Sequence, residues 1–302
     1  MVMLNNNKLG VVILNYNDSE HVRQLTQRIK SFSAIDYVII VDNCSTDDSR
    51  DLLNKLEGGK IIVIDSPRNG GYGYGNNFGI KYAKEKLNCK FAIIANPDVD
   101  FTNETVLALK VACEKNSDKC AIAACRQINT YAKHTKSAWK APTSYWNWVL
   151  SSEKILSHFT ASMWYTESYF SGKAIVPVDC VQGAMLLVDI DKFLSVGGYD
   201  ESIFLYCEEV DLALKIKENG FNCLFLPNYI YYHYHSQSIS KSFPSLKKQQ
   251  RLILQSQTKI MKKYWKISKP EWIVIKVIFS LSELELGIIG WIKYIRSKYI
   301  SK

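Results

Sequence analysis

Residues 38–49 read VIIVDNCSTDDS, a β-branched apolar run that stops abruptly at polar residues. Similar runs recur along the first half of the chain, and helix-like stretches such as HVRQLTQRIKSF and DDSRDLLNKLEG lie between them. Strands that alternate with helices indicate βαβ units and a mostly parallel sheet. The sequence therefore predicts an α/β fold, with strands at residues 11–14, 37–41, 60–64, 91–95 and 120–124.

Length and composition limit the class of protein. A chain of 302 residues with 47% hydrophobic residues suits one large α/β domain, or a domain with an appendage. The eight cysteines form no close C-x-x-C pair suited to zinc, and no basic-then-apolar signal stretch follows Met1. We therefore expect buried thiols and a cytoplasmic protein.

The net charge of +9 is distributed unevenly. Residues 241–302 hold 14 Lys and Arg against 3 Glu, a balance of +11, whereas residues 1–240 hold 24 against 26, a balance of −2. This asymmetry suggests an anionic partner for the tail, either a nucleic acid or a membrane surface. Because no recognised nucleic-acid-binding module accompanies the tail, we expect no nucleic-acid partner.

The tail contains an apolar segment, WIVIKVIFSLSELELGIIGWI at residues 272–292. Lys276, Glu283 and Glu285 interrupt it, so no uncharged run approaches the length of a membrane span. As a helix it has a broad apolar face, which is typical of peripheral attachment to an anionic membrane. Packing against the rest of the chain or in a homodimer is the alternative. On a helical wheel, one narrow face carries Lys276, Ser280, Glu283, Gly287, Gly290 and Ser297.

Residues 66–83 read SPRNGGYGYGNNFGIKYA, which looks like a loop that wraps a phosphate. A dinucleotide-binding loop needs G-x-G-x-x-G after a strand. Here Asn76 comes five residues after Gly71, and Phe78 comes five residues after Gly73. The glycine register therefore disfavours a nicotinamide oxidoreductase and favours another nucleotide ligand.

The same stretch places a cation beside unhindered backbone. Arg68 precedes the sequence NGG, so its guanidinium lies next to exposed N–H groups such as that of Gly70. Charge-assisted hydrogen bonds and a helix N-terminus together suit a diphosphate, and Asn76 can supply a further polar contact. Glycines used merely for turning are the alternative.

Polar residues also follow the first two strands. The strands end in Asn15-Tyr16 and Asp42-Asn43, at the edge where open α/β sheets bind ligands. Asp42 could accept hydrogen bonds from a nucleobase, and Ser45 or Thr46 could cap the next helix. A purely helix-capping role for Asp42 is the alternative.

The strand FAIIA ends in NPDVD at residues 96–100. If the strand continues, Asn96, Asp98 and Asp100 lie on one face, because alternate residues of an extended strand point the same way. Hard oxygen ligands at a strand end suit Mg²⁺ or Mn²⁺, which would also bind a diphosphate. A solvated acidic turn is the alternative.

A last group of candidates lies near residues 208–233. The carboxylates of Glu208, Glu209 and Asp211 stand at the start of a predicted helix, where the helix dipole favours them. His233 follows another strand. A carboxylate beside a metal-bound diphosphate could deprotonate an incoming hydroxyl, whereas helix-capping acids and a surface histidine are the alternative.

Taken together and in order, these segments resemble the family 2 inverting glycosyltransferases. The similarity is greatest to the bacterial rhamnosyltransferase-like branch that builds O-antigen and capsule chains, and it covers about residues 8–240. The segments that carry the resemblance are VVILNYN, VDNCSTDDS, RNGGYGYGNNFGIKYA, NPDVD, VQGAMLLV and GGYDESIFLYCEEVDL.

The resemblance implies a GT-A fold at residues 1–240, with a nucleotide-binding part at about 8–126 and an acceptor-binding part at about 127–240. Residues 241–302 would be a basic helical extension. The resemblance also implies binding of the base and ribose by Asn15, Tyr16, Asp42 and Asn43. Contacts to the rest of the nucleotide sugar would come from Arg68, Gly70, Asn76, Asn96 and Gly183.

The family's D-x-D motif falls on residues 96–98, so Asp98 would be a metal ligand and His233 a second one. The general base belongs to the acidic pair, and we place it on Glu209 rather than Glu208. This branch usually has Asp where Glu209 stands. It also tends to carry Arg just after the GA-x-L-L stretch, where this chain has VDID at residues 188–191.

The implied activity is transfer of L-rhamnose from dTDP-L-rhamnose to a glycan or lipid-linked glycan, at the inner face of the bacterial membrane. A UDP-hexose or UDP-galactofuranose donor is the alternative within the family. The Glu209 departure leaves open another class of function, a catalytically silent scaffold subunit that binds sugar nucleotides.

Overall fold

The structure is a computed structural model that describes residues 7–129, 135–153, 155–234 and 245–299, with side chains to residue 291. The chain divides into two compact units. Unit 1 comprises residues 1–141, 164–204 and 208–236, and unit 2 comprises residues 142–163, 205–207 and 237–302. The boundary expected after residue 240 lies outside the described residues.

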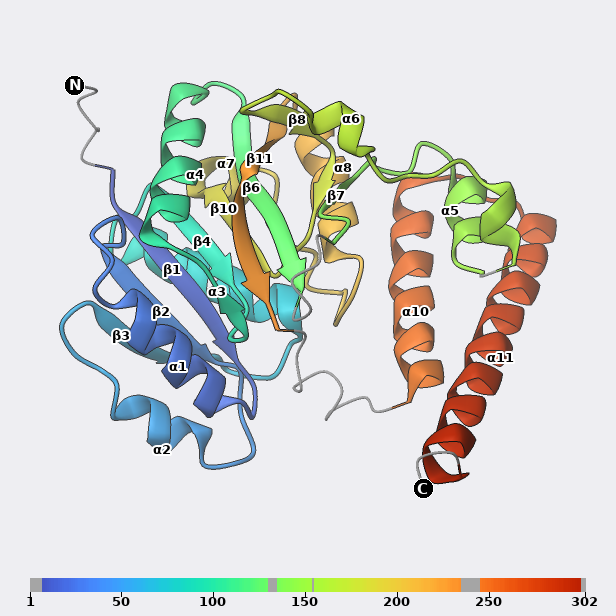
Figure 1. Cartoon of the computed structure of the whole chain (residues 1–302), viewed down its shortest axis with the longest axis horizontal. Coiled ribbons are helices and arrows are strands. Elements are labelled where there is room, and N and C mark those ends of the chain that lie inside the picture. Colours follow the sequence, from blue (N-terminus) through green and yellow to red (C-terminus); the bar gives the residue numbers. More distant parts are fainter. Residues whose placement is uncertain (1–6, 130–134, 154, 235–244, 300–302) are drawn as a thin grey trace. The chain divides into compact units, whose positions relative to one another are not determined.

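Unit 1 is built on a mixed sheet whose strands follow the order β3-β2-β1-β4-β10-β6-β11-β5, with β8 paired to β11 (Figure 1). The strands are β1 (Leu9–Asn15), β2 (Tyr37–Asp42), β3 (Ile61–Asp65), β4 (Phe91–Ala95), β5 (Val99–Asp100), β6 (Cys120–Asn129), β8 (Val176–Val178), β10 (Met185–Asp189) and β11 (Asn222–His233). All five strand ranges predicted from sequence fall on strands. The strands β3, β2, β1 and β4 are parallel, and β10 is antiparallel to both of its neighbours.

Helices cover both faces of this sheet. Successive strand residues point to opposite sides, and here both sets are apolar, so both faces need to be buried. Val11 and Ile13 of β1 lie in one core cluster, and Val12 between them lies in the other. The first cluster includes residues of α1 (Ser19–Ile29), α2 (Ser49–Asn54) and α4 (Asn103–Lys115). The second includes residues of α3 (Tyr72–Glu85), α6 (Glu167–Phe170), α7 (Ile190–Ser195) and α8 (Glu208–Glu218). Figure 1 shows the resulting three layers.

Between β6 and β8 the described residues form only short elements, of which α5 (Tyr145–Ser151) is the longest. Strand β7 (Ala138–Trp139) pairs with β9 (Cys180–Val181) in a small second sheet. After β9 the chain returns to the main sheet as β10. Six of the eight cysteines are buried, but Cys44 is exposed and Cys207 half-buried, so the expectation of buried thiols holds only in part.

Unit 2 consists mainly of α10 (Leu246–Tyr264) and α11 (Lys269–Tyr299), with α5 (Tyr145–Ser151) beside them. A polar network joins all three helices. The Gln250 side chain donates to the Ser282 hydroxyl at 2.8 Å, and this hydroxyl donates to the Ser152 carbonyl at 2.7 Å. Among the helices of the described residues, none combines the length and apolar character that crossing a bilayer requires.

Candidate active site

The ends of β1 and β2 are joined by a buried hydrogen-bond network. Asn15 and Asp42 lie opposite each other in the parallel register, and the Asn15 amide donates to Asp42 Oδ1 at 2.8 Å. The hydroxyl and backbone N–H of Ser45 donate to the two oxygens of the same carboxylate. Tyr16 follows Asn15 and is exposed. The network therefore fixes the Asp42 carboxylate at the strand end and leaves Tyr16 on the surface.

The capping role expected for Ser45 or Thr46 is wrong. Helix α2 begins at Ser49 with Asp48 as its N-cap residue. Ser45 bonds Asp42 instead, and the Thr46 backbone N–H donates to the Asn17 side chain at 2.8 Å. These hydroxyls hold the β1 and β2 loops together.

Asn43 holds the glycine-rich loop in place. Its amide donates to Asn69 Oδ1 at 3.1 Å and to the Gly71 carbonyl at 3.3 Å, and its own oxygen accepts from Ser66. Gly71 has φ of +91°, and a Cβ there would lie 2.2 Å from the Phe204 carbonyl oxygen. Only glycine tolerates both the left-handed backbone and this close approach.

Arg68 and Asn76, which were also expected to contact a ligand, lie in different surroundings. The exposed Arg68 guanidinium lies over the Tyr74 ring, 4.8 Å from its centroid, and Gly70 packs tightly on the same ring. Asn76 instead is fully buried within α3, where its amide donates to the Tyr72 carbonyl at 3.0 Å. Arg68 is thus accessible to an anionic ligand, whereas the contact expected of Asn76 would need its side chain to leave the core.

The structure brings Asp98 and His233 together across 135 positions of sequence. Asp98 Oδ1 lies 3.2 Å from His233 Nε2, and both side chains are largely buried. Strand β5 positions them, because it pairs antiparallel with β11 and places Val99 opposite His233. The Tyr234 backbone N–H also donates to the Asp98 carbonyl at 3.1 Å.

The expectation that residues 96–100 continue one strand is wrong. Strand β4 ends at Ala95, a turn follows, and β5 begins at Val99. Asn96 is half-buried, and its backbone N–H donates to the Ala184 carbonyl at 2.8 Å. Asp100 forms an ion pair with Arg28 at 3.6 Å and accepts from the Tyr234 hydroxyl. Asp98 and Asp100 therefore have different partners.

Glu209 is held by a chain of hydrogen bonds that starts on α3. The Tyr72 hydroxyl donates to the Gly183 carbonyl at 2.7 Å, and the Gly183 N–H donates to Glu209 Oε1 at 3.2 Å. A Cβ at Gly183 would lie 2.5 Å from that oxygen, so the carboxylate occupies the space beside the bare glycine. No local pattern indicated a role for Tyr72, because its hydrogen-bond partner lies 111 residues away.

The electrostatics place several carboxylates near this chain. Burial raises the pKa of Tyr72 well above its usual range, and the carboxylates of Glu209, Glu208 and Asp98 raise it further. Burial also raises the pKa of the Glu209 carboxyl, against the lowering effect of the backbone N–H groups that bond it. A raised pKa makes Glu209 a stronger base than a solvated glutamate.

The other two acids of α8 have separate surroundings. Glu208 is buried and contributes to the raised pKa of both Tyr72 and Tyr199. Asp211 is fully buried and lies 2.8 Å from Lys215 Nζ, which also donates to the Gly198 carbonyl. Lys215, held by Asp211, thus joins α8 to the loop that precedes it, whereas Glu208 lies close to the candidate base.

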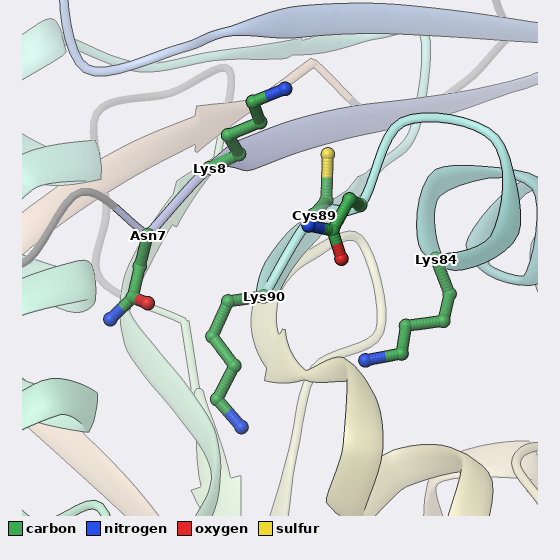
Figure 2. Close-up of a pocket in the computed structure, with 6 residues that line it drawn as sticks. Asn7, Lys8, Lys84, Cys89 and Lys90 are labelled. Carbon is green, nitrogen blue, oxygen red and sulfur yellow. The ribbon is translucent and has the colours of Figure 1, made fainter.

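A separate hollow lies at the opposite edge of the sheet, where β1 and β4 begin. It measures about 400 Å³ and is lined by Asn7, Lys8, Lys84, Asn88, Cys89 and Lys90 (Figure 2). Lys84 and Lys90 both pair with Asp191, and Lys90 also pairs with Asp189. These carboxylates neutralise the two lysines, so the hollow is a poor anion site despite its composition.

Comparison with known proteins decides the family. The profile that describes Glycosyl transferase family 2 matches residues 10–194, more than half of the chain. The chain belongs to this family. The matched residues include the loops after β1 and β2, the glycine-rich loop, Asp98 and Gly183. Glu209 and His233 come after the matched residues.

Two curated relatives and one solved structure illustrate what this family member resembles. It is 26% identical over 216 residues to the low-salt glycan biosynthesis hexosyltransferase Agl10 of Haloferax volcanii, covering 71% of this chain and 63% of the relative. It is 24% identical over 250 residues to the rhamnosyltransferase WbbL of Escherichia coli, covering 77% and 87%. The crystal structure of GalNAc-T7 with UDP, GalNAc and Mn²⁺ superposes with a TM-score of 0.62 at 15% identity, covering 97% of this chain and 54% of that one. The likeness shows the GT-A fold.

Two side chains of types that commonly bind metal ions lie next to each other in unit 1. Within the described residues no group of three or more His, Cys, Asp and Glu could hold a metal ion. Asp98 and His233 supply one carboxylate and one imidazole. A divalent ion in a nucleotide site needs one or two protein ligands, because substrate phosphates and water complete its coordination. The donor set therefore fits Mg²⁺ or Mn²⁺ bound together with a diphosphate.

Proposed function

We propose that this protein is a metal-dependent inverting glycosyltransferase that moves a sugar from a nucleotide sugar to a hydroxyl of a glycan or lipid-linked glycan. The observation that carries the proposal is the contact between Asp98 and His233, two residues distant in sequence that meet at 3.2 Å. Glu209 is held on the same unit by the Gly183 N–H. The carboxylates of Glu209, Glu208 and Asp98 all raise the pKa of Tyr72, which supports a common site for them.

In the proposed reaction, Asp98 and His233 would hold Mg²⁺ or Mn²⁺, which would supply positive charge to the departing diphosphate. Arg68 adds a second cation on the donor side. Glu209 removes the proton from the acceptor hydroxyl, whose oxygen attacks the anomeric carbon from the face opposite the leaving group. One displacement inverts the configuration, and the chain supplies no covalent nucleophile.

The proposed donor is dTDP-L-rhamnose, with a UDP-hexose or UDP-galactofuranose as the alternative. The similarity to a rhamnosyltransferase of Escherichia coli supports the first choice, and the hexosyltransferase of Haloferax volcanii keeps the second open. We place the reaction in bacterial surface polysaccharide synthesis, O-antigen or capsule, with the protein peripheral at the cytoplasmic face of the membrane. A homodimer stays open.

Donor hydrolysis and transfer by the purified full chain test this function. We expect turnover with one nucleotide sugar of a small panel, dependent on Mg²⁺ or Mn²⁺ and abolished by a chelator. Asp98→Asn and Glu209→Gln should each lower kcat at least about 100-fold, the scale of losing one charge-stabilising group or the base.

The control is Asp118→Asn, which removes an exposed carboxylate between α4 and β6. It should behave as the wild type. Wild-type turnover by Asp98→Asn or by Glu209→Gln would refute the site. Tight nucleotide binding without turnover, for every donor and acceptor, would instead identify a silent scaffold subunit.

A further inference from the structure

Helix α11 carries an apolar stripe on its exposed side. Its side chains are each 50–65% exposed, although all are large and hydrophobic. They recur at intervals of three and four residues, so they lie along one face of the helix. We call this set the outer stripe: Ile273, Val277, Leu281, Leu284, Ile288 and Trp291.

The opposite side of α11 is already occupied within unit 2. Ile275, Ile278, Phe279 and Ser282 are buried, and Ser282 joins the hydrogen-bond network with α10 and α5. The outer stripe is therefore a second apolar face that the folding of unit 2 does not use. A continuous exposed apolar surface of this kind marks a binding site rather than ordinary surface composition.

The charges around the outer stripe are mostly basic. Lys269 and Lys276 are exposed on α11, and Lys247 of α10 lines a hollow of about 180 Å³ together with Leu284, Ile288 and Trp291. Of the three acids of α11, Glu285 is half-buried beside the stripe, and the other two are engaged elsewhere. Glu271 accepts hydrogen bonds from Ser268 and Tyr145, and Glu283 pairs with Arg251 at 2.9 Å.

The combination selects an anionic bilayer rather than a second copy of the chain. Two copies would bring together tails that each carry a balance of +11 over residues 241–302, and like charges repel. A bilayer of anionic lipids offers acyl chains to the stripe and phosphates to the lysines. Because α11 does not cross a membrane, the contact would be peripheral.

We infer that the outer stripe inserts into the headgroup boundary of an anionic bilayer, with Lys247, Lys269 and Lys276 at the lipid phosphates. The inference rests on the proposed location at the membrane and names the surface that would achieve it. It is independent of which sugar is transferred.

Sedimentation with sucrose-loaded vesicles tests the inference on the full chain without donor or acceptor. We expect at least tenfold stronger partitioning onto vesicles of phosphatidylcholine and phosphatidylglycerol than onto phosphatidylcholine alone. Leu281→Gln with Leu284→Gln should lower partitioning onto the anionic vesicles at least tenfold. Donor hydrolysis in vesicle-free buffer should stay unchanged, so that a failed inference and a failed catalytic proposal give different results.

The matched control is Leu52→Gln with Leu107→Gln, which alters two exposed leucines of unit 1. It should partition as the wild type does, and all proteins should keep the same melting temperature. Undiminished partitioning by the stripe variant would overturn the inference. So would sedimentation velocity that showed a wild-type dimer dissociated by the stripe substitutions.

Discussion

The hydroxyl of Tyr72 and the backbone of Gly183 determine where the Glu209 carboxylate lies. Tyr72 donates to the Gly183 carbonyl at 2.7 Å, and the Gly183 N–H donates to Glu209. The Tyr72 ring is itself fixed by edge-on packing against Tyr199, with ring centroids 5.8 Å apart. Tyr72 thus positions the proposed base without a need to touch substrate, because its hydroxyl orients the Gly183 peptide group whose N–H binds Glu209.

Replacing Tyr72 by phenylalanine tests this positioning role. Tyr72→Phe keeps the ring packing but leaves the Gly183 carbonyl without its donor, which should cost about 0.5–1.5 kcal/mol of unfolding free energy. We expect kcat to fall at least about tenfold while KM for the donor stays unchanged. Steady-state kinetics and urea unfolding measure the two effects.

The control is Tyr169→Phe, because the Tyr169 hydroxyl also donates to a backbone carbonyl at 2.7 Å, that of Pro177. It should lower stability at most slightly and leave kcat unchanged. Equal kcat values for the two variants would show that Tyr72 has a structural role alone.

A methyl group at Gly183 should displace the proposed base directly. The added Cβ of Gly183→Ala would lie 2.5 Å from Glu209 Oε1 and 3.2 Å from Glu209 Cδ, so the carboxylate must move. A displacement of about 1 Å at a reacting group costs about 100-fold in rate. We expect that loss in kcat, measured by donor turnover, with little change in donor binding.

A second substitution makes this test specific. Aspartate is one methylene shorter than glutamate, so Glu209→Asp in the Gly183→Ala background should restore part of the lost kcat by relieving the contact. If the double variant is less active than Gly183→Ala, the loss does not arise from displacement of the Glu209 carboxylate.

At the scale of elements, α3 uses its glycines to approach the sheet. A Cβ at Gly75 would lie 2.2 Å from Leu14 Cδ1, and one at Gly79 would lie 2.5 Å from Val12 Cγ1. Two of the five glycines of this stretch therefore serve helix–sheet packing. The segment before Tyr72 is the part still available to a ligand, through Arg68.

Gly79→Ala should destabilise the protein. The new methyl group would also lie 2.9 Å from Val41 Cγ2, and such overpacking of a buried contact costs about 1–3 kcal/mol. Gly290→Ala in α11 is the matched control, because no atom lies within 4 Å of its added Cβ. It should stabilise its helix by about 0.5–1 kcal/mol. Urea unfolding followed by circular dichroism checks both, and a stabilised Gly79→Ala would contradict the packing.

The elements that the sequence predicted are those whose signal is local. The strands of the main sheet are β-branched runs bounded by polar residues, so their positions are readable without the fold. The two-residue strand β5 was missed, because its pairing to β11 depends on residues 132 positions away. Without β5 the turn at residues 96–98 was read as extended, and Asp100 was grouped with Asp98.

The residues of the candidate site likewise differ in how far the sequence alone could predict their roles. Asp98, His233 and Glu209 were candidates from the sequence itself, but their joint roles came through resemblance to a family, since neither periodicity nor spacing brings them together. Asn15 and Asn43 were read as ligand contacts, yet their amides bond Asp42 and the glycine-rich loop. A single sequence identifies polar residues at strand ends. Only the three-dimensional contacts show which of these residues hold the others in place.

At the scale of the whole molecule, charge is separated along the chain. Residues 1–240 carry a balance of −2 and residues 241–302 a balance of +11. A nearly neutral part exerts little long-range attraction on an anionic ligand, whereas the basic part is attracted to an anionic surface. Salt should therefore act on membrane binding and on donor turnover to different extents.

Vesicle binding should weaken with salt while donor hydrolysis changes little. Raising the ionic strength from about 0.1 M to 1 M shortens the Debye length from about 10 Å to 3 Å. Each basic residue at an anionic surface contributes about 1 kcal/mol, so screening of Lys247, Lys269 and Lys276 should lower partitioning about 10- to 100-fold. The outer stripe keeps a residual, salt-independent affinity, because burial of apolar surface does not depend on screening.

Lys269→Gln with Lys276→Gln should weaken binding at low salt and flatten the salt dependence. Partitioning that stayed constant across this range would mean that apolar contact alone holds the protein to the bilayer, and the lysines would then have no part in it.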